Sequence, residues 1–442
     1  MIGIKKQLAS MRTFLIIWSG QTASIVGSYM TTFALTLWAW ELTGQATALA
    51  LVYFFNRLAN VLISPLAGII VDRWNRKLLL VACDAAVGLS TLIILLLYLT
   101  NNLQIWHIYV TSTINGAFSC LQLLAYSASV SLLVPKEQYG RASSLDFLSS
   151  YGANIIAPAL AASFYYVIGL GGILCIDLIT FAIAVTTLLL VPIPQPPLTP
   201  TEAHPQKNIR QELFFGFRYI LARPSLMALV VVMSAFQLAH DFGAAVYSPM
   251  VLARSDNNAS ALASVSMAAG VGGVFGASLM STWGGPKRRI HAVLMSMVGA
   301  GLSKTVFGLG QNLSIWVPAQ FCSSFNFPLL GSCSQAIWLS KVRPDWQGRV
   351  FAASSMSVMV TSPIGYLLGG SLADYVFEPA MKPGGSLAPV FGGIFGTGAG
   401  AGMALLYVFC AICMLLIGLA GYAFPVLRDV EKVMPDHDAA IG

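Results

Sequence analysis

The chain has 442 residues, of which 57% are hydrophobic and only 9% are charged, and its net charge is +7. Soluble domains are about 45 to 50% apolar and about 25% charged, so this composition excludes an ordinary water-soluble protein. The basic residues stand in short clusters between apolar stretches, which excludes a nucleic-acid-binding surface and is typical of membrane topology.

Apolar stretches long enough to cross a bilayer as a helix, which takes roughly 20 residues, follow one another along the chain. They predict an all-α membrane protein with twelve transmembrane helices. A basic N-terminus without a small-residue cleavage site precedes the first stretch, so we expect a retained helix and not a signal peptide. The predicted spans are residues 13–39, 46–71, 78–99, 105–134, 142–168, 171–191, 226–251, 259–283, 290–309, 313–340, 349–376 and 399–424.

The spans divide into two halves around a single linker. Residues 1–191 are predicted to form an N-terminal six-helix bundle, and residues 226–424 a C-terminal six-helix bundle. Residues 192–225 are expected to form a cytoplasmic linker, and residues 425–442 a cytoplasmic tail.

The linker itself has two parts. Residues 192–205 are dense in proline and therefore extended. Residues 209–221 alternate charged and apolar side chains at helical spacing, which predicts an amphipathic helix lying on the membrane surface. A second irregular stretch, residues 378–400, is rich in glycine and proline and is expected to be an external loop.

The basic residues predict the orientation, because lysine and arginine are retained on the cytoplasmic side. With twelve spans, only Arg254 and Lys382 fall in loops on the other side, while Arg57 and Lys304 lie inside spans. This asymmetry predicts a multi-pass protein of the plasma (inner) membrane with both termini in the cytoplasm.

All seven cysteines lie inside apolar stretches, and the one Cys-x2-Cys pair, Cys410 and Cys413, lies within a predicted span and not in a polar loop. We therefore expect no disulfide and no metal site. The chain also lacks a phosphate-binding loop and the common hydrolase motifs, so we expect no cofactor and no enzymatic activity.

The two halves repeat. The stretch from Val134 to Arg141 that ends span four recurs from Val342 to Arg349 at the end of span ten, 208 residues later. The same shift aligns Gly68 with Gly276. Duplicated bundles of this kind place the substrate near the midplane between the halves and expose it to the two sides alternately.

The loop after span two reads Gly68-Ile-Ile-Val-Asp-Arg-Trp-Asn-Arg-Lys77. It resembles the signature of the major facilitator superfamily, Gly-x3-Asp-Arg-x2-Arg-Lys, and the resemblance implies the major facilitator fold of two pseudo-symmetric six-helix bundles. Physically, glycine allows close helix packing, and an Asp-Arg pair can form a charge contact that is made and broken. The conformational latch predicted here consists of Gly68, Asp72, Arg73, Arg76, Lys77 and Asp146.

Finer motifs narrow the resemblance. Glu41-Leu-Thr-Gly44, Gly140-Arg141-Ala-Ser-Ser and Ile176-Asp177-Leu-Ile-Thr-Phe resemble the branch that contains macrolide efflux proteins and the enterobactin exporter, which implies export. Exporters of the superfamily often carry Gly-x3-Gly-Pro-x2-Gly-Gly in span five. Residues 153–162 have alanine in place of each glycine, which leaves the direction of transport open.

Ionisable residues inside spans are functional candidates, because each costs roughly 2.5 to 3.5 kcal/mol or more to insert. His240 and Asp241 could bind and release a proton, or could form a polar contact that holds two spans together. Arg57 needs a carboxylate, carbonyls or an anionic substrate, so it serves either substrate binding or coupling, or a structural pairing with Asp84 or Asp241. Asp84, inside span three, is a further candidate for proton coupling or substrate binding. Lys304 and Asp177 lie near the external ends of their spans and are expected to snorkel.

Amide and aromatic residues predict a cavity that suits an amphipathic ligand. For each aromatic residue alone, lipid contact or core packing is the alternative. The cavity candidates are Gln21, Tyr29, Asn56, Gln122, Tyr126, Gln237, Gln320, Asn326 and Gln335.

The leading hypothesis is a secondary active transporter that exports an amphipathic drug or siderophore-like metabolite in exchange for protons. Its expected partners are the small-molecule substrate, protons and the lipid bilayer, without an obligate protein partner. Uptake of a nutrient by the same fold is the transport alternative. A membrane-embedded sensor or an intramembrane enzyme is the alternative from another class, although the chain encodes neither an output domain nor a catalytic motif.

Overall fold

The computed structural model describes residues 11–135, 138–193 and 209–433, and within these ranges the secondary structure is helical without a strand. This confirms the all-α fold class. The proline-rich part of the linker and the last residues of the tail lie outside the described residues, as do the side chains of Asp72 and Arg73.

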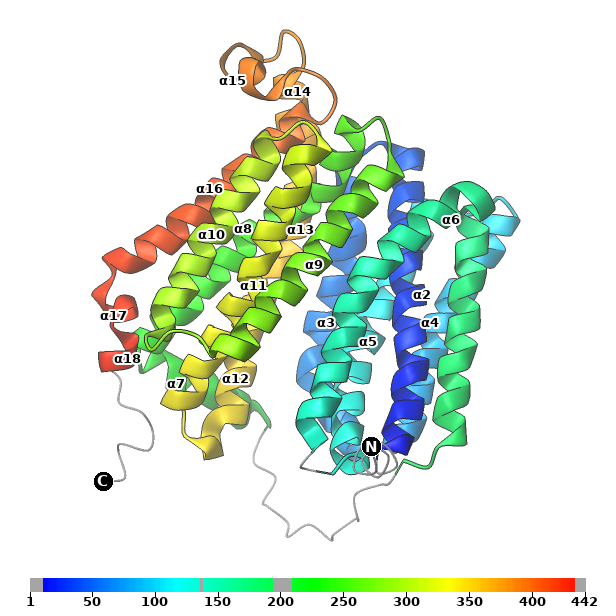
Figure 1. Ribbon diagram of the computed structural model, residues 1–442, viewed down its shortest axis with the longest axis vertical. Coiled ribbons are helices and arrows are strands. Elements are labelled where there is room, and N and C mark those ends of the chain that lie inside the picture. The colour runs from blue at the N-terminus through cyan, green and yellow to red at the C-terminus, as the bar shows by residue number, and fades with distance from the viewer. Residues whose placement is uncertain (1–10, 136–137, 194–208, 434–442) are drawn as a thin grey trace. The chain divides into compact units, whose positions relative to one another are not determined.

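Nine helical segments in the described part are long and apolar enough to cross a membrane. One of them, Arg141–Leu190, runs for 50 residues, which is far longer than a single crossing needs. It is interrupted at Gly169, whose φ of 67° is accessible mainly to glycine, and Figure 1 shows this helical segment as two arms that run in opposite directions. These segments support a multi-pass membrane protein, while the count of twelve spans stays a prediction.

The chain forms two compact units, Met1–Pro197 with Asn258–Met267, and Leu198–Asn257 with Ala268–Gly442. The domain boundaries expected from the sequence stay predictions. The helices of the first unit are α2 (Arg12–Thr43), α3 (Ala46–Arg73), α4 (Arg76–Leu99), α5 (Ile105–Leu133) and α6 (Tyr139–Leu190). α9 (Ala259–Trp283) begins in the first unit and continues in the second.

The second unit contains the remaining helices, and its short α14 and α15 project beyond the ends of α10 and α16 in Figure 1. They are α7 (Ile209–Leu221), α8 (Pro224–Arg254), α10 (Arg289–Leu309), α11 (Leu313–Lys341), α12 (Pro344–Met359), α13 (Thr361–Leu372), the π-helix η2 (Ala373–Phe377), α14 (Glu378–Met381), α15 (Ala388–Phe395), α16 (Ala401–Ala423), α17 (Pro425–Arg428) and α18 (Val430–Val433).

Polar and glycine residues set the helix ends. Gly44 ends α2 in the left-handed conformation, with φ of 58°. The Asn75 side chain caps α4 by accepting a hydrogen bond from the backbone N–H of Leu78, and Asn312 caps α11 in the same way. The polar punctuation that separated the predicted spans therefore acts as helix capping.

Close packing holds each unit together, because lipid tails are as apolar as the side chains and burial alone favours association little. In the first unit, a Cβ at Gly116 of α5 would overlap the carbonyl oxygen of Asn56 in α3. In the second unit, a Cβ at Gly272 of α9 would overlap the carbonyl oxygen of Phe321 in α11. In both units a glycine therefore allows two helix backbones to touch.

The predicted helix at residues 209–221 is present as α7, but its buried apolar side faces protein. Tyr219 and Ile220 belong to the core of the second unit, and the Tyr219 ring lies 5.6 Å from the ring of Trp346 in α12. A Cβ at Gly216 would overlap the carbonyl oxygen of Arg349. The buried side of α7 thus packs on α12, and the position of the helix at the membrane surface stays a prediction.

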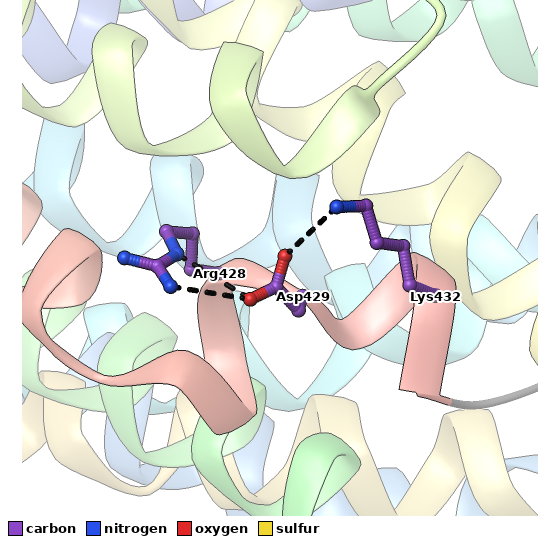
Figure 2. A network of polar contacts seen from close by, with 3 residues as sticks. All are labelled: Arg428, Asp429 and Lys432. Atoms are coloured by element: carbon purple, nitrogen blue, oxygen red, sulfur yellow. Dashed lines mark hydrogen bonds and ion pairs between the residues drawn. The ribbon is translucent and has the colours of Figure 1, made fainter.

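The beginning of the expected tail is folded against the second unit. Leu427 and Val430 are fully buried, and the Glu431 carboxylate accepts a hydrogen bond from the backbone N–H of Ile290 at 3.0 Å. Between these anchors, Asp429 contacts Arg428 at 3.3 Å and Lys432 at 3.5 Å on the exposed side (Figure 2). α17 and α18 therefore close one end of the unit.

Candidate functional site

In the first unit, a buried carboxylate is held by two amides. Asp84 of α4 is 1% exposed, and its two oxygens accept hydrogen bonds from Gln21 of α2 at 2.9 Å and from Gln122 of α5 at 2.5 Å. Gln122 also donates to the Gln21 side-chain oxygen at 3.2 Å. We call these three residues the Asp84 cluster. Three helices meet at a negative charge whose hydrogen-bond partners are uncharged.

The pairing of Arg57 with Asp84 that the sequence left open is not present. Arg57 is exposed, and within the described part of the chain it takes part in no hydrogen bond or ion pair. Both oxygens of Asp84 are occupied by amide donors instead. Arg57 therefore does not compensate the charge of Asp84.

In the second unit, a comparable group surrounds Asp241 of α8. It is 4% exposed, and its carboxylate accepts hydrogen bonds from Gln237 at 3.0 and 3.1 Å and from Ser362 of α13 at 2.6 Å. A Cβ at Gly365 would lie 2.7 Å from the Cβ of Asp241, so glycine is needed for this approach of α13. We call Asp241, Gln237 and Ser362 the Asp241 cluster. The ring of His240, next in the chain, packs against Phe327 of α11 at 5.0 Å.

A buried ammonium group lies in the same unit. Lys304 of α10 is 6% exposed, and its Nζ donates to the Tyr407 hydroxyl at 3.3 Å. The charge of Asp241 also acts on it. Lys304 and Asp177 were expected to snorkel, and this expectation is wrong. Asp177 is 3% exposed, and each of the two side chains is enclosed by its own unit.

Hydrogen-bond partners are described for only some of the predicted latch residues, among them Arg76 and Lys77. The Arg76 guanidinium donates to the Ala128 carbonyl oxygen at 2.7 Å, and the Lys77 Nζ donates to the Leu189 and Val191 carbonyl oxygens at 2.8 and 2.9 Å. These cations bind carbonyls near the ends of α5 and α6, where the helix dipole favours positive charge.

Of the other latch candidates, Asp146 has a hydrogen-bond partner, whereas Gly68 makes no close helix contact. Asp146 of α6 accepts a hydrogen bond from the Tyr126 hydroxyl at 2.9 Å. A Cβ at Gly68 would have no heavy atom within 4 Å, so no close approach depends on this glycine here. The side chains of Asp72 and Arg73 lie outside the described part of the structure. Their contact, and with it the latch, therefore stays a prediction.

The remaining cavity candidates either donate hydrogen bonds to groups of their own unit or are exposed. Asn56 donates to the Ser112 carbonyl at 3.3 Å, Gln320 donates to Ser324 at 3.4 Å, and Asn326 donates to the Cys322 carbonyl at 2.7 Å. The side chains of Tyr29 and Gln335 are exposed.

One apolar cavity, of about 510 Å³, lies inside the first unit between α2 and the two arms of α6. It includes none of the cavity candidates, so their assignment stays a prediction. It is lined by Trp18, Ser19, Thr22, Ala23, Val26, Gly27, Met30, Leu160, Phe164, Ile176 and Thr180.

Sequence reasoning missed two partners of the charged groups. Ser362 opens a glycine-rich helix and was read only as part of a span, although hydroxyls inside spans are signals of polar contacts. Tyr407 lies in the most apolar span and gave no comparable signal.

Comparisons with known proteins agree with this architecture. The family model described as Major Facilitator Superfamily matches residues 17–366. A macrolide efflux protein A of Streptococcus pyogenes is 24% identical over 368 residues, which cover 82% of this chain and 90% of that protein. An enterobactin exporter of Shigella flexneri is 24% identical over 315 residues, which cover 68% of this chain and 72% of that protein.

A solved nucleoside transporter, NupG, has the same fold, with a TM-score of 0.65 and 16% identity over 94% of this chain and 99% of that chain. The family model thus confirms the predicted resemblance to a known family. The similarity to a solved structure confirms the predicted fold.

Proposed function

The chain belongs to the Major Facilitator Superfamily, and we propose that it is a secondary active transporter that exports an amphipathic small molecule in exchange for protons. It resides in the plasma membrane with both termini in the cytoplasm and works by alternating access between its two halves. The similarity to a macrolide efflux protein and to an enterobactin exporter supports export of an amphipathic compound.

The single observation that carries the coupling proposal is the environment of two buried carboxylates, Asp84 and Asp241. Both are buried; Asp84 accepts hydrogen bonds from the amides of Gln21 and Gln122, and Asp241 accepts them from the Gln237 amide and the Ser362 hydroxyl. A buried charge is unfavourable unless it is compensated. Binding a proton neutralises such a carboxylate, which is the property that a coupling site needs.

Arg57 is the basic residue that we assign to substrate binding or to coupling. A guanidinium remains charged inside the protein, and Arg57 is exposed without a hydrogen-bond partner among the described residues. We assign it to an anionic or carbonyl-bearing part of the substrate, or to charge movement during coupling.

Uptake of a nutrient is the second candidate, because the same fold occurs in a nucleoside transporter. Intact cells that lack their own exporters discriminate the two. Expression of an exporter should lower the steady-state content of a macrolide or of enterobactin and raise tolerance of the macrolide, and de-energising the membrane should abolish both effects. Higher content in energised cells that express the protein would instead support uptake.

A further inference from the structure

Two arginines stack on neighbouring aromatic rings where α7 meets α12. The guanidinium carbon of Arg223 lies 3.5 Å from the centre of the Tyr219 ring, and that of Arg343 lies 5.0 Å from the centre of the Trp346 ring. The centres of the two rings are 5.6 Å apart. Both guanidinium groups therefore belong to one cluster, which joins the end of α7 to the start of α12.

Stacking leaves the hydrogen-bonding edge of a guanidinium free, because the ring covers its flat face while its N–H groups point outward in its plane. Arg223 uses one of these groups in a hydrogen bond to the Tyr219 carbonyl oxygen at 3.2 Å. It makes no other hydrogen bond or ion pair with the described residues. The rest of its planar fork has the geometry that binds a phosphate through two parallel hydrogen bonds.

A third guanidinium lies on the exposed side of α7. Arg218 is exposed, and its side chain makes no hydrogen bond or ion pair within the described part of the chain. Leu221, one turn later, is 63% exposed. An exposed apolar side chain beside an exposed arginine is typical of a helix that contacts both the acyl chains and the headgroups of a bilayer.

The two segments that build this surface are basic overall. Residues 209–223 contain three arginines and one acidic residue, and residues 341–349 contain three basic residues and one acidic residue. Their combined net charge is +4. Pairing within the two segments therefore leaves an excess of positive charge, which favours an anionic ligand.

The position of this surface along the unit favours a lipid headgroup over other anions. α8 begins at Pro224, directly after Arg223, and both α8 and the segment Trp346–Met381 are long and apolar enough to cross a membrane. Figure 1 shows α7 and α12 together at one end of the second unit. The stacked arginines thus lie where two membrane-crossing segments begin, which is the level of the headgroups in a bilayer.

We propose that Arg218, Arg223 and Arg343, which we call the arginine surface, bind the phosphate group of an anionic phospholipid. The guanidinium groups donate hydrogen bonds to the phosphate oxygens, and the exposed Leu221 contacts the acyl chain. The proposal is independent of the transported substrate and of the direction of transport, because binding can be measured on the purified protein without transport.

The test uses the purified full-length protein in a neutral detergent, with phosphatidylglycerol or phosphatidylcholine of equal chain length. At low salt, phosphatidylglycerol should raise the midpoint of thermal unfolding above the value in phosphatidylcholine by on the order of a degree or more. The difference should disappear near 1 M salt, where charges are screened within about 3 Å. Native mass spectrometry of the protein in a mixture of both lipids should show bound phosphatidylglycerol in excess.

Arg218→Gln separates a binding role from a structural one. Because the Arg218 side chain has no partner among the described residues, its loss should leave the unfolding midpoint in phosphatidylcholine unchanged, while the affinity for phosphatidylglycerol falls about fivefold. The double variant Arg218→Gln/Arg223→Gln should lose more than about tenfold. Arg288→Gln is the matched control, because Arg288 is an exposed arginine of the same unit outside both segments, and its loss should leave the affinity unchanged.

Two results would overturn the proposal. One is equal stabilisation of the wild-type protein by the two lipids, or wild-type affinity for phosphatidylglycerol in the double variant. The other is an equal rise of the unfolding midpoint with inorganic phosphate in the absence of lipid, because the ligand would then be a soluble anion.

Discussion

The guanidinium of Arg76 donates a hydrogen bond to the carbonyl oxygen of Ala128 at 2.7 Å. The second unit repeats this contact, since Arg289 donates to the carbonyl oxygen of Ala336 at 3.2 Å. Ala336 stands 208 residues after Ala128, the shift that aligns the two halves of the sequence. Arg289, however, stands 213 residues after Arg76, so the contact recurs between the start of one span and the next span although the second loop is five residues longer and lacks the aspartate of the first.

Replacing Arg289 by Gln should destabilise the second unit. The variant loses a hydrogen bond from a charged donor to a partly buried carbonyl, which is worth about 1.5 to 3 kcal/mol. The neighbouring Arg288 is exposed, so Arg288→Gln is the matched control and should change stability little. Thermal unfolding of both purified variants measures the difference. Equal midpoints would mean that the contact has no structural role.

Asp241→Asn should abolish gradient-driven transport while leaving substrate counterflow intact. The amide keeps the size of the side chain but cannot take up and release the coupling proton. Ser362→Ala is the companion variant, because Ser362 only positions the carboxylate and its loss should shift the pH profile of transport without eliminating it. Driven transport that survives in Asp241→Asn would remove this residue from the coupling role.

Arg57→Gln should severely reduce transport, because the exposed guanidinium is assigned to the substrate or to coupling. Arg57→Lys retains the charge but loses the planar fork of donors, so it should keep part of the activity. Initial rates at several substrate concentrations distinguish weaker binding from slower turnover. Wild-type rates in Arg57→Gln would refute the assignment.

Glu431→Gln should loosen the α17 and α18 segment, because the carboxylate accepts a hydrogen bond from the backbone N–H of Ile290 in the first turn of α10. A charged acceptor near a helix N-terminus contributes about 0.3 to 1 kcal/mol when exposed and more when partly buried. Protease cleavage within residues 424–433 should therefore accelerate in the variant. An unchanged cleavage rate would contradict the anchoring role.

Asp429→Asn is the control for that segment, because Asp429 lies on its exposed side (Figure 2). Desolvation raises the pKa of its carboxyl, but the hydrogen bond from Arg428 and the charges of Arg428 and Lys432 outweigh it, so the pKa lies below its usual value. The stabilisation is thus present above the pKa of the unfolded chain and is lost as pH falls through the folded value. Asp429→Asn should therefore change the rate of protease cleavage within residues 424–433 little at neutral pH, and should leave the stability of the segment unchanged in strong acid.

Hydropathy and repeats predicted the helical fold because helix length and apolar composition are imposed by the bilayer itself. α2, with 32 residues, and α11, with 29, are long enough to cross but are not among the nine most apolar segments. Both contain polar residues that the sequence had already marked as cavity candidates, such as Gln21 and Gln320.

Side-chain partners were harder to predict, since they depend on how helices rotate against one another. Asp177 lies near the predicted end of a span, and the rule that charges there snorkel failed because Gly27 allows α2 to enclose it. The amphipathic pattern of α7 could not distinguish a membrane surface from α12, because both offer an apolar face. Gln237 and Asp241, by contrast, are one turn apart on α8, so local helical geometry is sufficient to explain their contact.

The central claim is proton-coupled export, and inside-out membrane vesicles test it most directly. With the interior made acidic, the vesicles should accumulate a macrolide or enterobactin, and a protonophore should release it, while vesicles with Asp241→Asn should accumulate none. Accumulation that occurs only in right-side-out vesicles, or that is unaffected by the protonophore, would contradict the account.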